Sequence, residues 1–274
     1  MTRVLMVALL IGSICPTAFS QNTKPTTSLD DNRREAERLW ELAIAAKGGR
    51  ERLYSVKNLQ VSIREKVRYL IRRLPFIVEG LYVFPGKSWE WDDQRPAIFG
   101  FSVIVYNHDQ DMKFWYLDHG KGGSSGKASL SDSIYGDGAM TSLRYIQLRY
   151  FMETKWVKPI PISVEKGKAG RKSVDVVQTI VSGPTRGGKN EERIAFALDQ
   201  KTHLPLQIIF YTVSFGQEYS GAVPLSDYVD VDGIQMPSKV YGLKTNCQIN
   251  VDYDEQIFMR EPNIEAGIQQ WMKK

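Results

Sequence analysis

The sequence predicts a mostly β (α+β) fold, in which a single strongly curved antiparallel sheet or incomplete barrel has about ten strands. Two or three helices are expected to pack in or over the concave face of this sheet. Three observations support this fold class. Apolar residues alternate with a period of two over much of the chain, and short turn signals separate the alternating segments. No regular alternation of strands and helices occurs, which argues against a parallel doubly wound sheet.

The first twenty residues are typical of a cleavable secretory signal. Arg3 supplies the positive charge, Val4 to Ile11 is an unbroken apolar run, and Ala18-Phe19-Ser20 places small residues at the −3 and −1 positions of a cleavage site. The apolar run is too short to cross a hydrocarbon core of about 30 Å, which needs about 20 residues. We therefore expect cleavage after Ser20 and export to the periplasm.

Cys15 leaves a second interpretation of this segment open, a lipoprotein signal in which the cysteine is lipidated. Ile14 precedes the cysteine, where such signals usually have a small residue. Beyond Ser20 we expect a flexible leader over residues 21–34 and a single domain over residues 35–274.

Composition limits the possible function classes. The net charge of +5 becomes +4 once Arg3 is removed, which is less basic than a nucleic-acid-binding domain requires. Only Cys247 remains after cleavage, so the mature chain contains no intrachain disulfide. No later segment reaches membrane-spanning length, so we expect a soluble or peripheral protein, without nucleic acid as a partner.

The domain begins with a helix. Ser28, Asp30 or Asp31 can cap it, and its apolar positions include Leu39, Leu42 and Ala43 at helical spacing. Lys47-Gly48-Gly49 ends it, and a short helical turn over Glu51 to Val56 follows.

The strands then follow in order. Asp232-Gly233 is a two-residue hairpin turn between two of them, and residues 107–111 form another hairpin loop. The expected strands are Leu59–Ile71, Phe76–Phe84, Ser88–Asp92, Phe99–Tyr106, Met112–Leu117, Ile162–Glu165, Val174–Val181, Arg193–Leu198, Leu206–Phe215, Ser226–Val231, Ile234–Leu243 and Cys247–Phe258.

Three segments between and after the strands are not β. Gly120 to Ser133 is rich in Gly, Ser and Lys without periodicity, so we expect a mobile loop there. Thr141 to Trp156 has apolar residues at intervals of three and four and predicts a helix. Pro262-Asn263 begins a final short helix.

With the strands in this order, the chain resembles the LolA/LolB-like, or outer-membrane lipoprotein-sorting, superfamily of periplasmic proteins. The resemblance lies in ordered phrases over most of Glu35 to Ile268. They are Ala46-Lys47-Gly48-Gly49 with Val56-Lys57-Asn58-Leu59, Phe196-Ala197-Leu198-Asp199 with Leu204-Pro205-Leu206, Tyr228 to Pro237, and Asn250-Val251-Asp252-Tyr253.

The resemblance implies an incomplete barrel with helices in its mouth, enclosing an apolar cavity for acyl chains. Strand segments such as Phe76-Ile77-Val78 and Ile208-Ile209-Phe210-Tyr211 are apolar at successive positions, unlike a sheet covered on one face. We expect the cavity to be lined by aromatic residues of these and neighbouring strands: Phe76, Tyr82, Phe84, Trp89, Trp91, Phe101, Trp115 and Phe210.

Catalytic and metal-binding patterns are weak. His108, His119 and His203 show no zinc-site spacing, so we expect no metal and no cofactor. Gly122 to Gly126 fits the nucleophile-elbow pattern around Ser124, with Asp199 and His203 downstream, but the strained strand-to-helix turn of that motif is not predicted here. We expect no enzyme activity, and we interpret Cys247 as a packed thiol.

The sequence therefore favours a non-catalytic periplasmic carrier or binder of a lipid, a lipoprotein or another apolar ligand, which we expect to be a monomer. Its expected partners are the acyl chains of a lipid or a lipoprotein, and an envelope protein and a membrane surface are further candidate partners. An envelope sensor or protein-binding module on the same fold is the alternative, and a hydrolase is the third hypothesis.

Overall fold

The computed structural model describes residues 28–69, 72–93, 101–107, 113–117, 123–127, 143–182, 191–214 and 217–258. The expected secretory signal, the tip of the 107–111 loop and the helix expected from Pro262 lie outside these residues. Contacts group the chain into two compact units. The first unit comprises Met1–Ser55 and Gln147–Gly242, and the second comprises Val56–Ile146 and Leu243–Lys274. The single domain over residues 35–274 stays a prediction.

The first unit begins with helix α1 (Leu29–Ala46). The Ser28 hydroxyl accepts a hydrogen bond from the Asp31 N–H at 3.2 Å, which is the expected N-cap contact. The helix therefore begins inside the leader that was expected over residues 21–34, because a capped first turn is available at Ser28. Its buried face comprises Ala36, Leu39, Trp40, Ala43 and Ile44.

Gly48 and Gly49 end α1 with positive φ angles of 121° and 88°, as glycine at a helix C-terminus permits. Helix α2 (Arg50–Ser55) follows.

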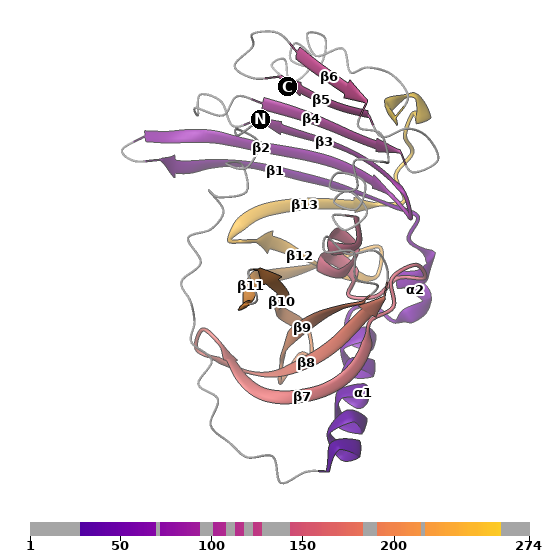
Figure 1. Ribbon diagram of the computed structural model, residues 1–274, viewed down its shortest axis with the longest axis vertical. Coiled ribbons are helices and arrows are strands. Elements are labelled where there is room, and N and C mark those ends of the chain that lie inside the picture. Colours follow the sequence, from indigo (N-terminus) through magenta and orange to yellow (C-terminus); the bar gives the residue numbers. More distant parts are fainter. Residues whose placement is uncertain are drawn as a thin grey trace. The chain divides into compact units, whose positions relative to one another are not determined.

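The sheet of the first unit has six antiparallel strands in the order β12-β11-β10-β9-β8-β7. Figure 1 shows β7 and β8 strongly bent, with α1 running beside β7. The Trp40 ring meets the Phe196 ring edge-on, with 5.0 Å between their centroids. The strands are β7 (Ile160–Ala169), β8 (Lys172–Ser182), β9 (Glu191–Asp199), β10 (Pro205–Ser214), β11 (Gln217–Val231) and β12 (Ile234–Val240).

The Asp232-Gly233 hairpin is confirmed. Val231 pairs with Ile234 across the turn, and both turn residues have positive φ, 52° and 80°. Positive φ at both central positions is the requirement of a type I′ turn, which suits the twist of the strands it joins.

The sheet of the second unit has seven antiparallel strands in the order β6-β5-β4-β3-β2-β1-β13. They are β1 (Asn58–Tyr69), β2 (Arg72–Val83), β3 (Lys87–Asp93), β4 (Phe101–Asn107), β5 (Lys113–Leu117), β6 (Gly123–Lys127) and β13 (Leu243–Ile249). The mostly β, antiparallel fold predicted from the sequence is thus confirmed.

Two expected segments are corrected in this unit. Part of the loop expected over Gly120 to Ser133 is strand β6, because its backbone pairs with β5 from Leu117↔Gly123 to Lys113↔Lys127. The strand expected over Cys247 to Phe258 ends at Ile249, and Glu255–Phe258 is a 3₁₀ helix, η2. Asn250 has a φ of 52°, which turns the chain out of the sheet.

The internal helix ends at residue 151, earlier than the expected Trp156. Met152 has a φ of 67°, and its N–H donates to the Leu148 carbonyl at 3.0 Å. The Thr154 hydroxyl then accepts from the Val157 N–H at 3.1 Å and holds the chain in a turn. Among the described residues, no helix is both long enough and apolar enough to cross a membrane.

Candidate functional site

The eight aromatic residues expected to line a cavity fall into both units. Phe210 lies in β10 of the first unit, and the other seven lie in or beside β2, β3, β4 and β5 of the second. Tyr82 and Phe84 are each only 6% exposed, and the Tyr82 hydroxyl donates to the Glu90 carboxylate at 2.7 Å. Trp89 and Phe210 are half-buried. The side chains of Phe76, Trp91, Phe101 and Trp115 lie outside the described residues.

The strand register separates two of these aromatic residues. Tyr82 pairs with Leu59, whereas Trp89 pairs with Leu81, the residue before Tyr82. Because directly paired residues share a face and successive residues alternate, Tyr82 and Trp89 lie on opposite faces of the sheet. These two aromatic residues therefore cannot line one cavity on a single face.

The strands β8, β9 and β10 of the first unit are apolar on both faces. On one face, Phe196 packs against Trp40 of α1, and its register partners Val177 and Ile208 are fully buried. On the other face a second cluster is buried, comprising Val174, Val176, Ala195, Ala197 and Ile209. Small side chains, two of them alanines, form much of this second cluster.

A cavity of about 330 Å³ adjoins this second cluster. Ile162, Val176 and Ile209 supply its apolar lining. Ligand pockets of small molecules begin at about 300 Å³ and combine apolar walls with a few polar groups, so this cavity has the size and composition of a small pocket. Its polar lining comprises Ser163, Glu165, Lys166, Gln178, Arg193, Tyr211 and Ser220.

The polar side of this cavity is organised by contacts among its lining residues and with the neighbouring Asp175. The Gln178 amide donates to the Tyr211 hydroxyl at 3.1 Å, and the Arg193 guanidinium lies 4.3 Å from the centre of the Tyr211 ring. Lys166 forms an ion pair with Asp175 at 2.5 Å. Positive and negative groups therefore both border an apolar interior, as an amphipathic ligand would require.

A second hollow, of about 310 Å³, lies beside α1 in the first unit. Its buried carboxylate is Glu153, which accepts from Trp40 Nε1 at 2.9 Å, from Arg50 Nε at 2.9 Å and from the Tyr54 hydroxyl. Burial alone would raise the pKa of Glu153, but hydrogen bonds from Arg50, Tyr54 and Trp40 lower it below its ordinary value. Burial and the hydrogen bond to Glu153 raise the pKa of Tyr54 to about 12. Because these groups satisfy one another, we assign them a structural role.

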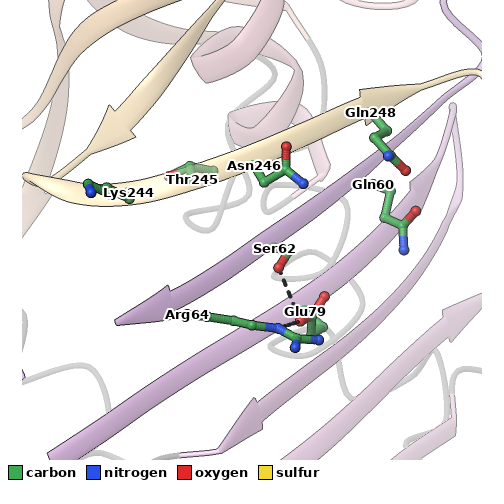
Figure 2. Close-up of a pocket in the computed structure, with 8 residues that line it drawn as sticks. All are labelled: Gln60, Ser62, Arg64, Glu79, Lys244, Thr245, Asn246 and Gln248. Atoms are coloured by element: carbon green, nitrogen blue, oxygen red, sulfur yellow. Dashed lines mark hydrogen bonds and ion pairs between the residues drawn. The ribbon is translucent and has the colours of Figure 1, made fainter. Parts of the chain in front are cut away.

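A third hollow, of about 570 Å³, lies in the second unit and is polar (Figure 2). It is lined by Gln60, Ser62 and Arg64 of β1, Glu79 of β2, and Lys244, Thr245, Asn246 and Gln248 of β13. Figure 2 shows Glu79 between Ser62 and Arg64, and its carboxylate accepts a hydrogen bond from each of them. An acyl chain would find no apolar side chain in this lining.

The nucleophile-elbow interpretation finds no support in the geometry. Ser124 lies within β6, paired with Tyr116, and not at a strand-to-helix turn. The Asp199 carboxylate accepts from the N–H groups of Lys201 and Thr202 at 2.9 and 3.0 Å, so it closes a turn. Burial would raise the pKa of Asp199, but these hydrogen bonds and Lys172 lower it. Cys247 is buried in β13, in agreement with a packed thiol.

No group of three or more His, Cys, Asp or Glu side chains that could hold a metal ion occurs in the described ranges. His108 and His119 lie outside them.

Comparisons with known proteins give structural similarities only. No protein-family model matches the chain, and no curated protein sequence matches it. A DUF1329 family protein from Desulfovibrio piger aligns with a TM-score of 0.45 at 13% identity, covering 81% of this chain and 96% of that one. A LolA superfamily protein from Nitrosomonas europaea aligns with a TM-score of 0.44 at 14% identity, covering 82% and 97%.

A third solved structure is named as an outer membrane lipoprotein-sorting protein domain from Vibrio parahaemolyticus. It aligns with a TM-score of 0.42 at 15% identity, covering 81% of this chain and 97% of that one. Two of the three names are those of the superfamily that the sequence phrases resemble. Similarities at these TM-scores carry no argument about function.

Proposed function

We propose that this protein is a non-catalytic carrier or binder of a lipid, a lipoprotein or another apolar ligand in the periplasm. One observation carries the proposal: β8, β9 and β10 are buried and apolar on both faces, and a cavity of about 330 Å³ adjoins the face opposite α1. A sheet that only supported a helix would need one apolar face. The second apolar face is therefore available to shape a binding site.

Burial of the apolar acyl chain supplies the binding free energy. An acyl chain gains about 0.8 kcal/mol for each methylene that leaves water, so a few buried methylenes against Ile162, Val176 and Ile209 suffice for weak binding. Polar groups around Tyr211 would orient the other end of the ligand without reacting with it. The expected signal over the first twenty residues motivates the periplasmic location.

The eight aromatic positions stay predicted ligand contacts. Phe210 lies between Ile209 and Tyr211 in β10, both of which line the cavity. Because successive residues of a strand alternate between its faces, the Phe210 side chain is on the opposite face, where its register partner is Ile194, and it is not part of this cavity.

The test measures binding of a dansyl-labelled undecanoic acid to the mature protein by fluorescence. Ile162→Asp places a charge in the cavity wall, so we expect about a tenfold or greater loss of affinity. Ile162→Ala, which removes apolar contact without adding charge, should lose less. Ile160→Asp is the matched control, because Ile160 lies in the same strand, is 50% exposed and does not line this cavity.

Two results would contradict the proposal. One is the absence of probe uptake by the wild-type protein, and the other is equal affinity in the Ile162 variants, the Ile160 variant and the wild type. A stoichiometric protein partner captured from envelope fractions, with no lipid in the complex, would favour the sensor or protein-binding alternative instead.

A further inference from the structure

We infer that the polar hollow of the second unit is a binding site for a small saccharide of one or two sugar rings. The hollow of about 570 Å³ lies over β13, β1 and β2 (Figure 2), and it shares no lining residue with the cavity proposed above. The inference stands independently of acyl-chain binding.

The lining has the hydrogen-bonding chemistry of a sugar site. The carboxamides of Gln60, Asn246 and Gln248 each offer both donors and acceptors, and the hydroxyl of Ser62 does the same. Sugar hydroxyls also donate and accept, so each can be matched by such a group. Gln60, Asn246 and Gln248 are exposed, which leaves their amides accessible to a ligand.

The register brings these groups onto one face. Gln60 pairs with Gln248, and Ser62 pairs with both Asn246 and Glu79. Paired residues on neighbouring strands lie about 5 Å apart, so the polar groups form a two-dimensional array. An array of this kind can contact several hydroxyls of one ring.

Glu79 gives the floor of the hollow a fixed acceptor. Its side chain is only 5% exposed, and its Oε1 accepts from Arg64 Nε at 2.8 Å and from the Ser62 hydroxyl at 3.1 Å. Held in this way, the carboxylate is preorganised to accept hydrogen bonds from a ligand.

Trp89 adds an apolar surface on the same face. It pairs with Leu81, which pairs with Gln60, so Trp89 lies two strands from the amide array, about 10 Å away. Its side chain is half-buried. The face of an indole ring suits the C–H face of a pyranose, and a disaccharide has the length to reach from Trp89 to Gln60.

Other ligand classes fit this hollow less well. A phosphate or carboxylate ligand would meet Lys244, but it would also approach the Glu79 carboxylate, whose Arg64 partner is already engaged with it. An extended peptide binds sheets through the backbone of an edge strand, but β1 and β2 are each paired on both sides, with β13, β1, β2 and β3 as successive neighbours. A ligand at this face therefore contacts polar side chains and not unpaired backbone groups. This favours a neutral polyhydroxylated ligand.

The test uses isothermal titration calorimetry of the mature protein with cellobiose and with N,N′-diacetylchitobiose. We expect at least one disaccharide to bind with a dissociation constant of about 1 mM or tighter. Gln60→Ala and Asn246→Ala should each weaken binding about tenfold, the effect of losing one or two hydrogen bonds. Gln256→Ala is the matched control, because it removes an exposed residue with the same carboxamide side chain that does not line the hollow, and it should leave affinity unchanged.

The inference is overturned if neither disaccharide binds, or if both Ala variants bind as tightly as the wild type. It is also overturned if a tetra-alanine peptide binds the hollow more tightly than both disaccharides. Because Gln60 and Asn246 are exposed, both variants should fold, and unchanged melting temperatures would verify this. The acyl probe should not compete with the sugar, so failure of one proposal is distinguishable from failure of the other.

Discussion

At the scale of single residues, Glu153 is a buried carboxylate that joins α1 and α2 of the first unit. It is 4% exposed and receives hydrogen bonds from Trp40, Arg50 and Tyr54. We expect Glu153→Ala to destabilise the protein by ~3 kcal/mol, because Trp40 Nε1–H would be left buried without an acceptor. Chemical denaturation measures this change.

Glu41→Ala is the control for that substitution. Glu41 also pairs with Arg50, at 2.9 Å, but its side chain is 60% exposed. Exposed ion pairs contribute about 0 to 1 kcal/mol, so the control should unfold close to the wild type. Equal destabilisation by the two substitutions would show that the buried network around Glu153 has no special role.

The same carboxylate predicts a pH dependence. Its pKa is lowered in the folded protein, so its contribution to stability is fully present above the ordinary value of 4.5 and is lost as the pH falls through the lowered value. The difference in unfolding free energy between the wild type and Glu153→Gln should therefore shrink as the pH is reduced from 6 to about 3. A difference that grew at low pH would contradict the direction of this pKa shift.

The residues that line the cavity could not be predicted from residue type alone. Tyr82 and Trp89, two of the aromatic candidates, lie on opposite faces of their sheet. The apolar residues that line the cavity in the first unit are Ile162, Val176 and Ile209. Ile162 lies in a register shift between Pro161 and Ser163, and a register shift leaves no signature in the alternation of apolar residues.

At the scale of elements, the connection from α1 to α2 is constrained by close backbone approach. A Cβ atom on Gly48 would lie 2.2 Å from the Gly233 carbonyl oxygen in the β11–β12 turn, whereas one on Gly49 would meet nothing within 4 Å. We expect Gly48→Ala to cost about 3 kcal/mol or more and Gly49→Ala about 1 kcal/mol, since only φ strain acts at Gly49. Thermal denaturation of the two variants provides the comparison, and equal losses would contradict the account.

The edge of β7 is protected by a side chain of α1. Asn32 Nδ2 donates to the Val164 carbonyl at 3.2 Å, and its Oδ1 accepts from the Val164 N–H at 2.7 Å. The Asn32 amide thus takes the place of a neighbouring strand at this residue, as edge strands require.

Asn32→Ala should therefore speed hydrogen exchange of the Val164 amide and cost about 1 to 2 kcal/mol of stability. Arg33→Ala, which removes only the exposed ion pair with Glu37, should change neither quantity appreciably. Unchanged exchange at Val164 in the Asn32 variant would disprove the role of this side chain.

Elements whose residues show a regular period or a turn signal were predictable from the sequence. Elements that exist only because their backbone pairs with another segment were not. The Asp232-Gly233 turn follows from residues that tolerate positive φ. Strand β6 has the sequence Gly-Ser-Ser-Gly-Lys, which has no apolar period, and it is a strand because β5 pairs with it. The end of β13 likewise depends on Asn250, whose Oδ1 accepts from the Lys57 N–H at 2.7 Å. These two residues are far apart in the sequence, so this contact could not be predicted.

At the scale of the whole molecule, the sequence predicted the fold class because binary patterning and turn signals agree along the chain. The polar hollow could not be predicted, because it is shaped by β1, β2 and β13, which are distant in sequence. The two proposed sites differ in chemistry, because the first combines three apolar lining residues beside a buried cluster with polar residues, whereas the second is lined by polar residues alone. Acyl-chain binding at the first of them is the central claim.

Native mass spectrometry of the mature protein, purified gently from the periplasm without detergent, tests that claim most directly. The account predicts a species heavier than the polypeptide by the mass of an acyl-bearing lipid, and excess fatty acid should displace this lipid. Ile162→Asp should shift the population toward the unliganded mass, whereas Ile160→Asp should not. Repeated recovery of the bare polypeptide, together with no uptake of added fatty acid, would contradict the account.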